Sequence, residues 1–217
     1  MAPNDPTKDE LLQKAIAGDQ GAFAALFEQY RARLRKMVVL RMDVRVKGRL
    51  DASDVLQEAY IDAAQQLPNY AKEPKLPVFL WLRLLTGQRL AKTHRKHLGT
   101  AKRDVRREIS LGRGQVPEAS TFNLASRLVG NFTTASSYLR REELRNKIQG
   151  VLNQMKPNDR EVLALRHFEQ MTIRESAIVL GITEKAAGNR YLRAVERIAN
   201  VFEEASGLLS KQNSDED

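Results

Sequence analysis

The chain has 217 residues, a length that suits one domain or two small ones. Hydrophobic residues make up 42% of the sequence and aromatic residues only 6%, so we expect small cores that are mainly aliphatic. Lys and Arg number 36 against 27 Asp and Glu, and the resulting net charge of +9 favours a polyanionic partner. Cysteine is absent, which excludes disulfide bonds and thiolate metal sites.

The N-terminus and the most apolar run both argue against secretion or membrane insertion. The first residues, MAPNDPTKDE, lack the basic and then apolar pattern of a signal peptide. Residues 76–85 form the most apolar run, which is about half as long as a membrane span and contains Arg83. We therefore expect a cytoplasmic protein.

Four helices are predicted within residues 9–98, and no segment of the chain shows the alternation of a strand. The first carries the apolar residues of 11–16, and the second carries those of 23–38. Asp51 caps the third helix, and Pro77 begins the fourth. The apolar stripe of the third helix consists of Leu56, Tyr60, Ala63 and Leu67. These patterns predict an all-α fold.

Composition changes between residues 99 and 137, where glycine, serine and threonine interrupt the helical pattern. This predicts a flexible linker of roughly forty residues, with a helical turn or two near Phe122–Leu128. Helical periodicity returns from residue 138 to about residue 209, and an acidic tail, Asp215–Asp217, follows it. We therefore expect two small helical domains, 9–98 and 138–209, joined by the linker.

Residues 155–198 predict a helix-turn-helix motif, with Pro157 beginning a supporting helix in front of it. Thr172 and Glu175 form a capping box, and Gly181 then ends the short helix that they begin. Thr183 caps the next helix almost at once. The residues expected to be buried are Ile173, Ala177, Ile178 and Leu180 on the first helix, and Ala187, Tyr191, Val195 and Ile198 on the second.

The second helix of this motif has a cationic face. Lys185, Asn189 and Arg193 share that face, with Arg190 and Arg197 beside them. Helix-turn-helix proteins place their base contacts near the start of this helix. The alternative is an αα-hairpin whose charged face only meets solvent.

Two further patterns lie in the N-terminal helices. Asp54, Gln57, Glu58 and Asp62 form an acidic face on the third helix, for which simple solvation is the alternative. The fourth helix begins with aromatic and apolar residues and becomes strongly cationic in its second half. Aromatic rings next to cations suit single-stranded or opened nucleic acid, although for Phe79, Trp81 and Leu82 themselves a place in the core is the better explanation.

Together these motifs resemble a bacterial RNA polymerase sigma factor of the sigma-70 superfamily, of the extracytoplasmic-function type. Residues 54–60 (DVLQEAY) are similar to the family's motif for docking on the clamp helices of the largest polymerase subunit. Residues 79–96 resemble the segment of region 2 that opens and reads the promoter −10 element, and residues 155–197 resemble region 4, which binds the −35 element. The resemblance implies that the linker follows the RNA-exit path of the polymerase.

The resemblance also implies partners and site residues. The partners would be core RNA polymerase, through its clamp helices and flap, and promoter DNA, with an anti-sigma factor as a candidate regulator. No cofactor and no catalysis are implied. The residues expected to bind the −35 duplex are Thr183, Lys185, Asn189, Arg190 and Arg193. Those expected at the −10 element are Tyr70, Lys75, Trp81, Arg83, Gln88, Arg89, Lys92, Arg95 and Lys96, and those expected to bind polymerase are Asp54, Gln57, Glu58 and Asp62.

Three positions depart from the family pattern. Gly188 stands where these factors often carry a larger residue on the recognition helix, and Gln88 stands where Asn is common. The Tyr70–Lys75 segment, expected to be a loop, is not the commoner short polar form. These departures leave the promoter sequence open.

Two other classes of protein are alternatives to a sigma factor. A stand-alone helix-turn-helix regulator is the leading alternative, but residues 10–98 carry no ligand-binding fingerprint. An enzyme would need a site that the chain does not offer, since no phosphate-cradling glycine loop or nucleophile motif occurs. His94 and His97 could in principle share a metal, but they lie among cations and lack a nearby carboxylate. We therefore expect no metal site.

Overall fold

The computed structural model describes residues 7–46, 50–98, 116–132 and 138–212, with only the backbone described for 98, 131–132, 138–140 and 206–212. Every regular element in these ranges is a helix, which confirms the predicted all-α fold. The chain divides into two compact units, Met1–Glu118 and Ala119–Asp217. Their boundary falls within the stretch predicted to be a linker. Residues 99–115 and 133–137 of that stretch, and the acidic tail, lie outside the described ranges.

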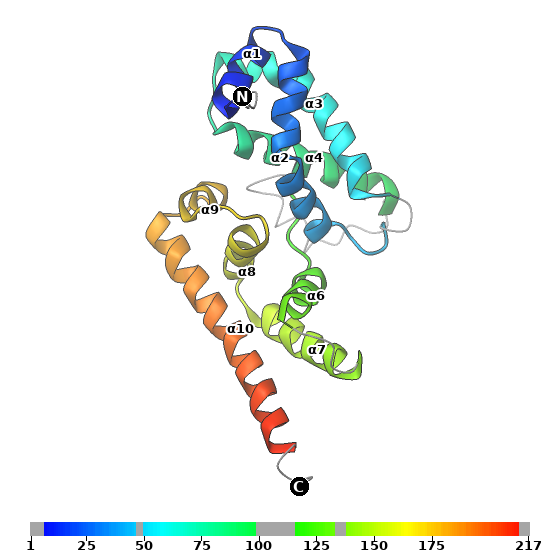
Figure 1. Cartoon of the computed structure of the whole chain (residues 1–217), viewed down its shortest axis with the longest axis vertical. Coiled ribbons are helices and arrows are strands. Elements are labelled where there is room, and N and C mark those ends of the chain that lie inside the picture. The colour runs from blue at the N-terminus through cyan, green and yellow to red at the C-terminus, as the bar shows by residue number, and fades with distance from the viewer. Residues whose placement is uncertain (1–6, 47–49, 99–115, 133–137, 213–217) are drawn as a thin grey trace, which may run out of the picture. The chain divides into compact units, whose positions relative to one another are not determined.

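The described part of the first unit is a bundle of four helices (Figure 1). They are α1 (Lys8–Ile16), α2 (Gln20–Arg41), α3 (Ala52–Lys72) and α4 (Val78–Leu98). Asp51 starts α3 with a capping box, and Pro77 directly precedes α4, as the sequence predicted. Leu34 of α2, Leu56 of α3 and Leu82 of α4 are fully buried, and these three helices contact one another. The core is therefore built from the predicted apolar stripes.

Helix α3 is longer at its C-terminal end than the sequence predicted. It continues past Pro68 to Lys72, so Tyr70 lies in its last turn and the prediction of a loop from Tyr70 was wrong. Tertiary contacts explain the extension. The Tyr70 ring stacks on Trp81 at a centroid distance of 4.3 Å, and its hydroxyl donates to the Leu76 carbonyl at 2.9 Å.

Gly87 has no side chain and so leaves room on α4 for the side chain of Val116. A Cβ atom built at this position would lie within 3.0 Å of three side-chain atoms of Val116, so only glycine admits this contact. Val116 follows the first part of the predicted linker in the sequence. The chain therefore returns to α4 before it enters the second unit.

The second unit begins with α6 (Thr121–Phe132) and α7 (Tyr138–Gln154), which pack against each other. Helix α6 occupies the place where the sequence predicted only a helical turn or two. Its interior residues Leu124 and Ala125 are fully buried, which explains why this part of the predicted linker is ordered. The remaining elements are α8 (Pro157–Leu163), a π-helical turn η2 (Ala164–Phe168), α9 (Ile173–Leu180) and α10 (Glu184–Gln212).

The helix-turn-helix is formed by α9 and α10, with α8 as its support. Thr172 and Glu175 make the predicted capping box, and Gly181 ends α9 in the left-handed conformation with φ of 63°. Val162 of α8 packs with Ala177 of α9 and Ala187 of α10. The predicted start, turn and supporting helix of the motif are thus confirmed.

Two of the residues predicted to be buried are on the surface instead. Ile178 is 43% exposed and Val195 is 37% exposed. In α10 Ala194 is buried in place of Val195. Ala194 comes seven residues after Ala187 and points within about 20° of the same direction, whereas Val195 comes eight residues after it and points about 80° away. The stripe that began at Ala187 therefore continues through Ala194 and Ile198 rather than through Val195.

Candidate polymerase and nucleic-acid interfaces

The acidic face of α3 contains three exposed residues and one that is partly covered. Asp54, Gln57 and Glu58 are exposed, whereas the Asp62 side chain is only 25% exposed. Asp54 has a structural task as well, since its carboxylate accepts a hydrogen bond from the Asp51 backbone at 2.9 Å in the capping box. Ile61, which was not among the residues predicted to bind polymerase, is 49% exposed beside them. Its position three and four residues after Glu58 and Gln57 is the signal that was missed.

The residues predicted for the −10 element do not form one surface. Tyr70, Trp81 and Arg83 are buried, with Arg83 only 3% exposed. Burial raises the pKa of the Tyr70 hydroxyl. The stacked rings of Tyr70 and Trp81 are part of the core of the first unit. The aromatic residues at the start of α4 therefore belong to the core.

The other residues of this set lie nearer to solvent. Lys92, Arg95 and Lys96 are exposed at i, i+3 and i+4 on α4, and this spacing gives them a common face. Gln88 is partly buried. Lys75, in the segment between α3 and α4, is exposed and pairs with Glu73 at 3.2 Å.

Arg89 is held by the acidic face of α3. Its Nε donates to Asp62 at 2.7 Å, a second N–H contacts the other oxygen of the same carboxylate, and a third donates to Glu58 at 3.2 Å. The hydrogen bonds that Arg89 donates to Asp62 raise the pKa of Arg89. Five cations of α4 were expected at the −10 element. In the structure Arg83 is buried and Arg89 is paired with carboxylates, so only the other three are exposed.

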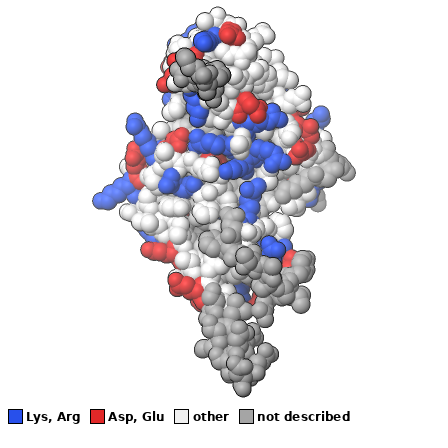
Figure 2. Space-filling model, viewed as in Figure 1, with Lys and Arg blue, Asp and Glu red and all other residues white. Residues whose placement is uncertain are grey.

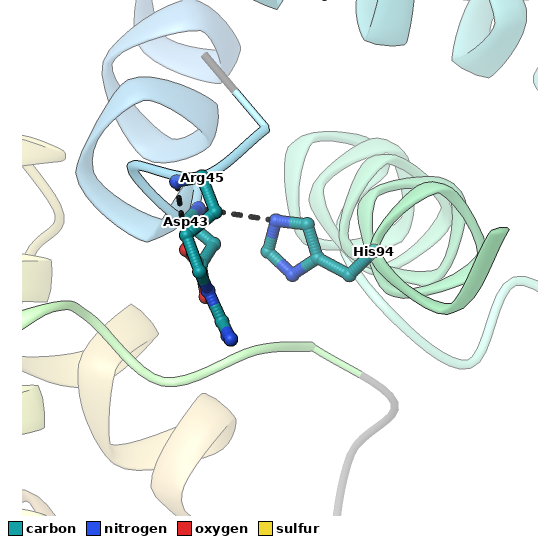
Figure 3. A network of polar contacts seen from close by, with 3 residues as sticks. All are labelled: Asp43, Arg45 and His94. Carbon is teal, nitrogen blue, oxygen red and sulfur yellow. Dashed lines mark hydrogen bonds and ion pairs between the residues drawn. The ribbon is translucent and has the colours of Figure 1, made fainter. Parts of the chain in front are cut away.

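His94 anchors the C-terminal part of α4 to the segment that follows α2 (Figure 3). Its Nε2 accepts a hydrogen bond from the Asp43 backbone N–H at 3.2 Å. The Asp43 carboxylate in turn accepts hydrogen bonds from the Arg45 guanidinium at 2.7 and 3.0 Å, and this interaction lowers its pKa to about 2. His94 thus acts as a hydrogen-bond acceptor that joins α4 to the segment after α2.

The predicted recognition helix is α10. Thr183 caps it, with its hydroxyl accepting from the Ala186 N–H at 3.2 Å. Lys185, Asn189 and Arg193 are exposed, as a DNA-reading face requires. Arg190 differs from them because its guanidinium contacts the Asp159 carboxylate of α8 at 2.6 Å and its side chain is 31% exposed.

A groove of about 390 Å³ runs beside this helix. Four cations line it, and Asp159 is the one acid among its lining residues. Lys156 and Asp159, from the start of α8, were not among the predicted site residues. The full lining is Gln154, Met155, Lys156, Asp159, Ala186, Asn189, Arg190, Arg193, Ala194 and Arg197.

Charge on the surface is mixed in sign. Figure 2 shows one face of the molecule, on which Asp and Glu side chains border the Lys and Arg side chains. Within the ranges that the structure describes, no three His, Asp or Glu side chains gather in a way that would hold a metal ion. None of the described helices has the length and apolarity that crossing a membrane would need.

Comparisons with known proteins agree with this geometry. The family model described as "Sigma-70, region 4" matches residues 145–198, which contain the helix-turn-helix. The RNA polymerase sigma-H factor of Pseudomonas aeruginosa is 24% identical over 196 residues, covering 87% of this chain and 90% of that protein. The structure of CnrH in complex with the cytosolic domain of CnrY matches with a TM-score of 0.51 and 19% identity, covering 89% of this chain and 95% of CnrH, and shows a shared fold. Residues 145–198 of the chain thus match region 4 of the sigma-70 family, and the chain is similar to an RNA polymerase sigma factor along nearly its whole length.

Proposed function

We propose that the chain binds core RNA polymerase and directs it to specific promoters, where it initiates transcription. The observation that carries this proposal is that α10, the second helix of a helix-turn-helix with capped helices, exposes Lys185, Asn189 and Arg193. The likeness to sigma-H along nearly the whole chain supports the same role. The first unit would serve as region 2 and the second as region 4, with residues between 99 and 137 connecting them.

At the −35 element, different residues of α10 have different tasks. Lys185 and Asn189 lie on the first two turns, where side chains reach base edges, so they would set the preferred sequence. Arg193, one turn further on, would meet a phosphate and contribute to affinity on every sequence. Arg190 is held by Asp159, so we assign it the orientation of α10 on α8, with phosphate as a competing partner.

At the −10 element, the exposed cations of α4 would bind the backbone of the opened strand. Lys92, Arg95 and Lys96 carry this role, with Lys75 and Gln88 as further candidates. Tyr70, Trp81 and Arg83 support the helix from inside the unit. Replacing Lys92, Arg95 and Lys96 by glutamine should impair promoter opening, seen as lower permanganate reactivity of unpaired thymines, more than it impairs binding to core polymerase.

The exposed face of α3 would dock on the clamp helices of the polymerase, and region 4 would contact the flap. Gln57 and Glu58 offer polar contacts there and Ile61 offers an apolar one. Asp54 is a poor probe of this docking, because its removal would also weaken the start of α3.

The decisive experiment is run-off transcription with purified core polymerase, together with a core-binding assay. The variant Glu58→Lys should lose both core binding and transcription. Glu73→Lys makes the same change of charge at an exposed position just beyond α3, and it should leave core binding unchanged. Normal core binding by folded Glu58→Lys would remove the argument for docking on α3. A wild-type chain that binds −35 DNA alone and never comigrates with core polymerase would be a stand-alone regulator.

The structural match to CnrH, solved with the cytosolic domain of CnrY, suggests one further partner. We propose that an anti-sigma protein of this kind binds the chain and keeps it from polymerase. Co-purification from the source cells, followed by release of transcription when the partner is removed, would test this regulation.

A further inference from the structure

Arg89 joins the two helices that carry the proposed polymerase and −10 surfaces. It lies on α4, and its guanidinium donates hydrogen bonds to the carboxylates of Asp62 and Glu58 on α3. Its side chain is 17% exposed, whereas Asp62 is 25% exposed and Glu58 is 57% exposed. The guanidinium is therefore well covered, and one of the two carboxylates that it contacts faces solvent.

The geometry of the two contacts is unequal. Asp62 receives two parallel hydrogen bonds, which is the bidentate arrangement that fixes a guanidinium and a carboxylate in one plane. Glu58 receives a single bond at 3.2 Å. Asp62 is thus the anchor of Arg89, and Arg89 in turn restricts the position of the Glu58 carboxylate.

A DNA role for Arg89 would require this arrangement to break. A phosphate would have to displace a bidentate carboxylate that is largely shielded from water, and it would leave Asp62 without its cation. Lys92, one turn along α4, is exposed and offers its ammonium group to a phosphate directly. The same helix therefore supplies two cations for comparison, Arg89, which is largely covered and paired, and Lys92, which is exposed.

We propose that Arg89 is a positioning residue of the polymerase-docking surface, which uses Asp62 as its anchor to hold the Glu58 carboxylate on the exposed face of α3. This inference rests on the proposed function, since it assumes that α3 docks on polymerase. It reassigns Arg89 from DNA to polymerase binding, and it reassigns Asp62 from direct docking to anchoring.

The test uses the full chain and titrates core RNA polymerase and an opened −10 strand separately. Arg89→Gln should weaken core binding about tenfold, because a restrained charged contact is lost. The salt dependence of −10 binding should not change. Asp62→Asn should act like Arg89→Gln, and the double variant should be no weaker than either single one, because both residues serve one contact. Arg89→Lys, which cannot form the bidentate pair, should fall between wild type and Arg89→Gln.

Lys92→Gln is the control. It should leave core binding unchanged and reduce the slope of log affinity against log salt by about 0.7, the value for one phosphate of a single strand. If Arg89→Gln instead behaves like Lys92→Gln, Arg89 is a DNA contact and the proposal is wrong.

A purely structural role gives a third pattern. In that case Arg89→Gln would lower the melting temperature and weaken core and DNA binding to the same extent, which would also overturn the proposal. Circular dichroism at the assay temperature establishes how much of each variant is folded. A wild-type chain that does not bind core polymerase would refute the proposed function itself, and this role of Arg89 with it.

Discussion

Gly188 lies inside the recognition helix at a position where alanine should fit. A Cβ atom built there meets no heavy atom within 4 Å, and the same holds for Gly150 inside α7. Glycine in a helix interior costs about 1 kcal/mol relative to alanine. Gly188→Ala and Gly150→Ala should therefore each stabilise the second unit by about 1 kcal/mol, or by roughly 4–8 °C in melting temperature for a unit of this size.

The two substitutions should differ in their effect on DNA. Gly188 lies between Lys185 and Asn189, on the part of α10 that we propose enters the groove. An added methyl group there would separate the helix backbone from the bases, so Gly188→Ala should weaken −35 binding. Gly150 lies on α7, away from the recognition helix in sequence, and Gly150→Ala should leave −35 binding unchanged.

Two measurements on each variant test this reasoning. Far-ultraviolet circular dichroism follows unfolding of both units, whereas the fluorescence of Trp81, the single tryptophan, follows the first unit only. We expect the dichroism transition of the second unit to move and the Trp81 transition to stay. Fluorescence anisotropy with a −35 duplex measures binding. A Gly188→Ala variant that is less stable than wild type would refute the argument that a Cβ atom fits at this position. A variant that is more stable but binds the −35 duplex as tightly as wild type would refute the close approach of the helix backbone to DNA.

Three further predictions concern local contacts. Arg45 lowers the pKa of Asp43 from 3.8 to about 2, so this stabilisation is present above pH 4 and is lost as the pH falls towards 2. Asp43→Asn should cost about 1 kcal/mol at pH 7, allowing for solvent screening, and progressively less below pH 4 in denaturant titrations. Tyr70→Phe removes the hydrogen bond to the Leu76 carbonyl and should cost about 1 kcal/mol, measured by Trp81 fluorescence. Thr172→Ala breaks the capping box of α9 and should cost the second unit about 1 kcal/mol by circular dichroism, whereas no change would show that the cap is redundant.

Helix boundaries were predictable because their signals are local. Thr172 and Glu175 are three residues apart, and Gly181 needs no distant partner to adopt its left-handed conformation. Asp51 likewise acts on its own helix. The extension of α3 past Pro68 was not predictable in this way, since it depends on a ring stacked from another helix.

The ion pairs between charged residues on different helices could not be predicted from the sequence. Arg89 and Asp62 are 27 residues apart, and Arg190 and Asp159 are 31 residues apart. No periodicity links positions on different helices, so each of these cations was predicted to face DNA. The exposed cations Lys92, Arg95 and Lys96, by contrast, were predicted from helix spacing alone.

The distinction between buried and exposed cations has a measurable consequence for the −10 interaction. On the sequence alone, α4 offers five cations to phosphate, Arg83, Arg89, Lys92, Arg95 and Lys96, and these would give a salt slope of about 3.5 on single-stranded DNA. The structure buries Arg83 and pairs Arg89 with Asp62 and Glu58, which leaves three exposed cations and a slope of about 2. Binding of a fluorescent −10 strand at several salt concentrations separates the two values. A slope near about 3.5 would mean that Arg83 and Arg89 also bind phosphate, and that the ion pairs of Arg89 with Asp62 and Glu58 break when DNA binds.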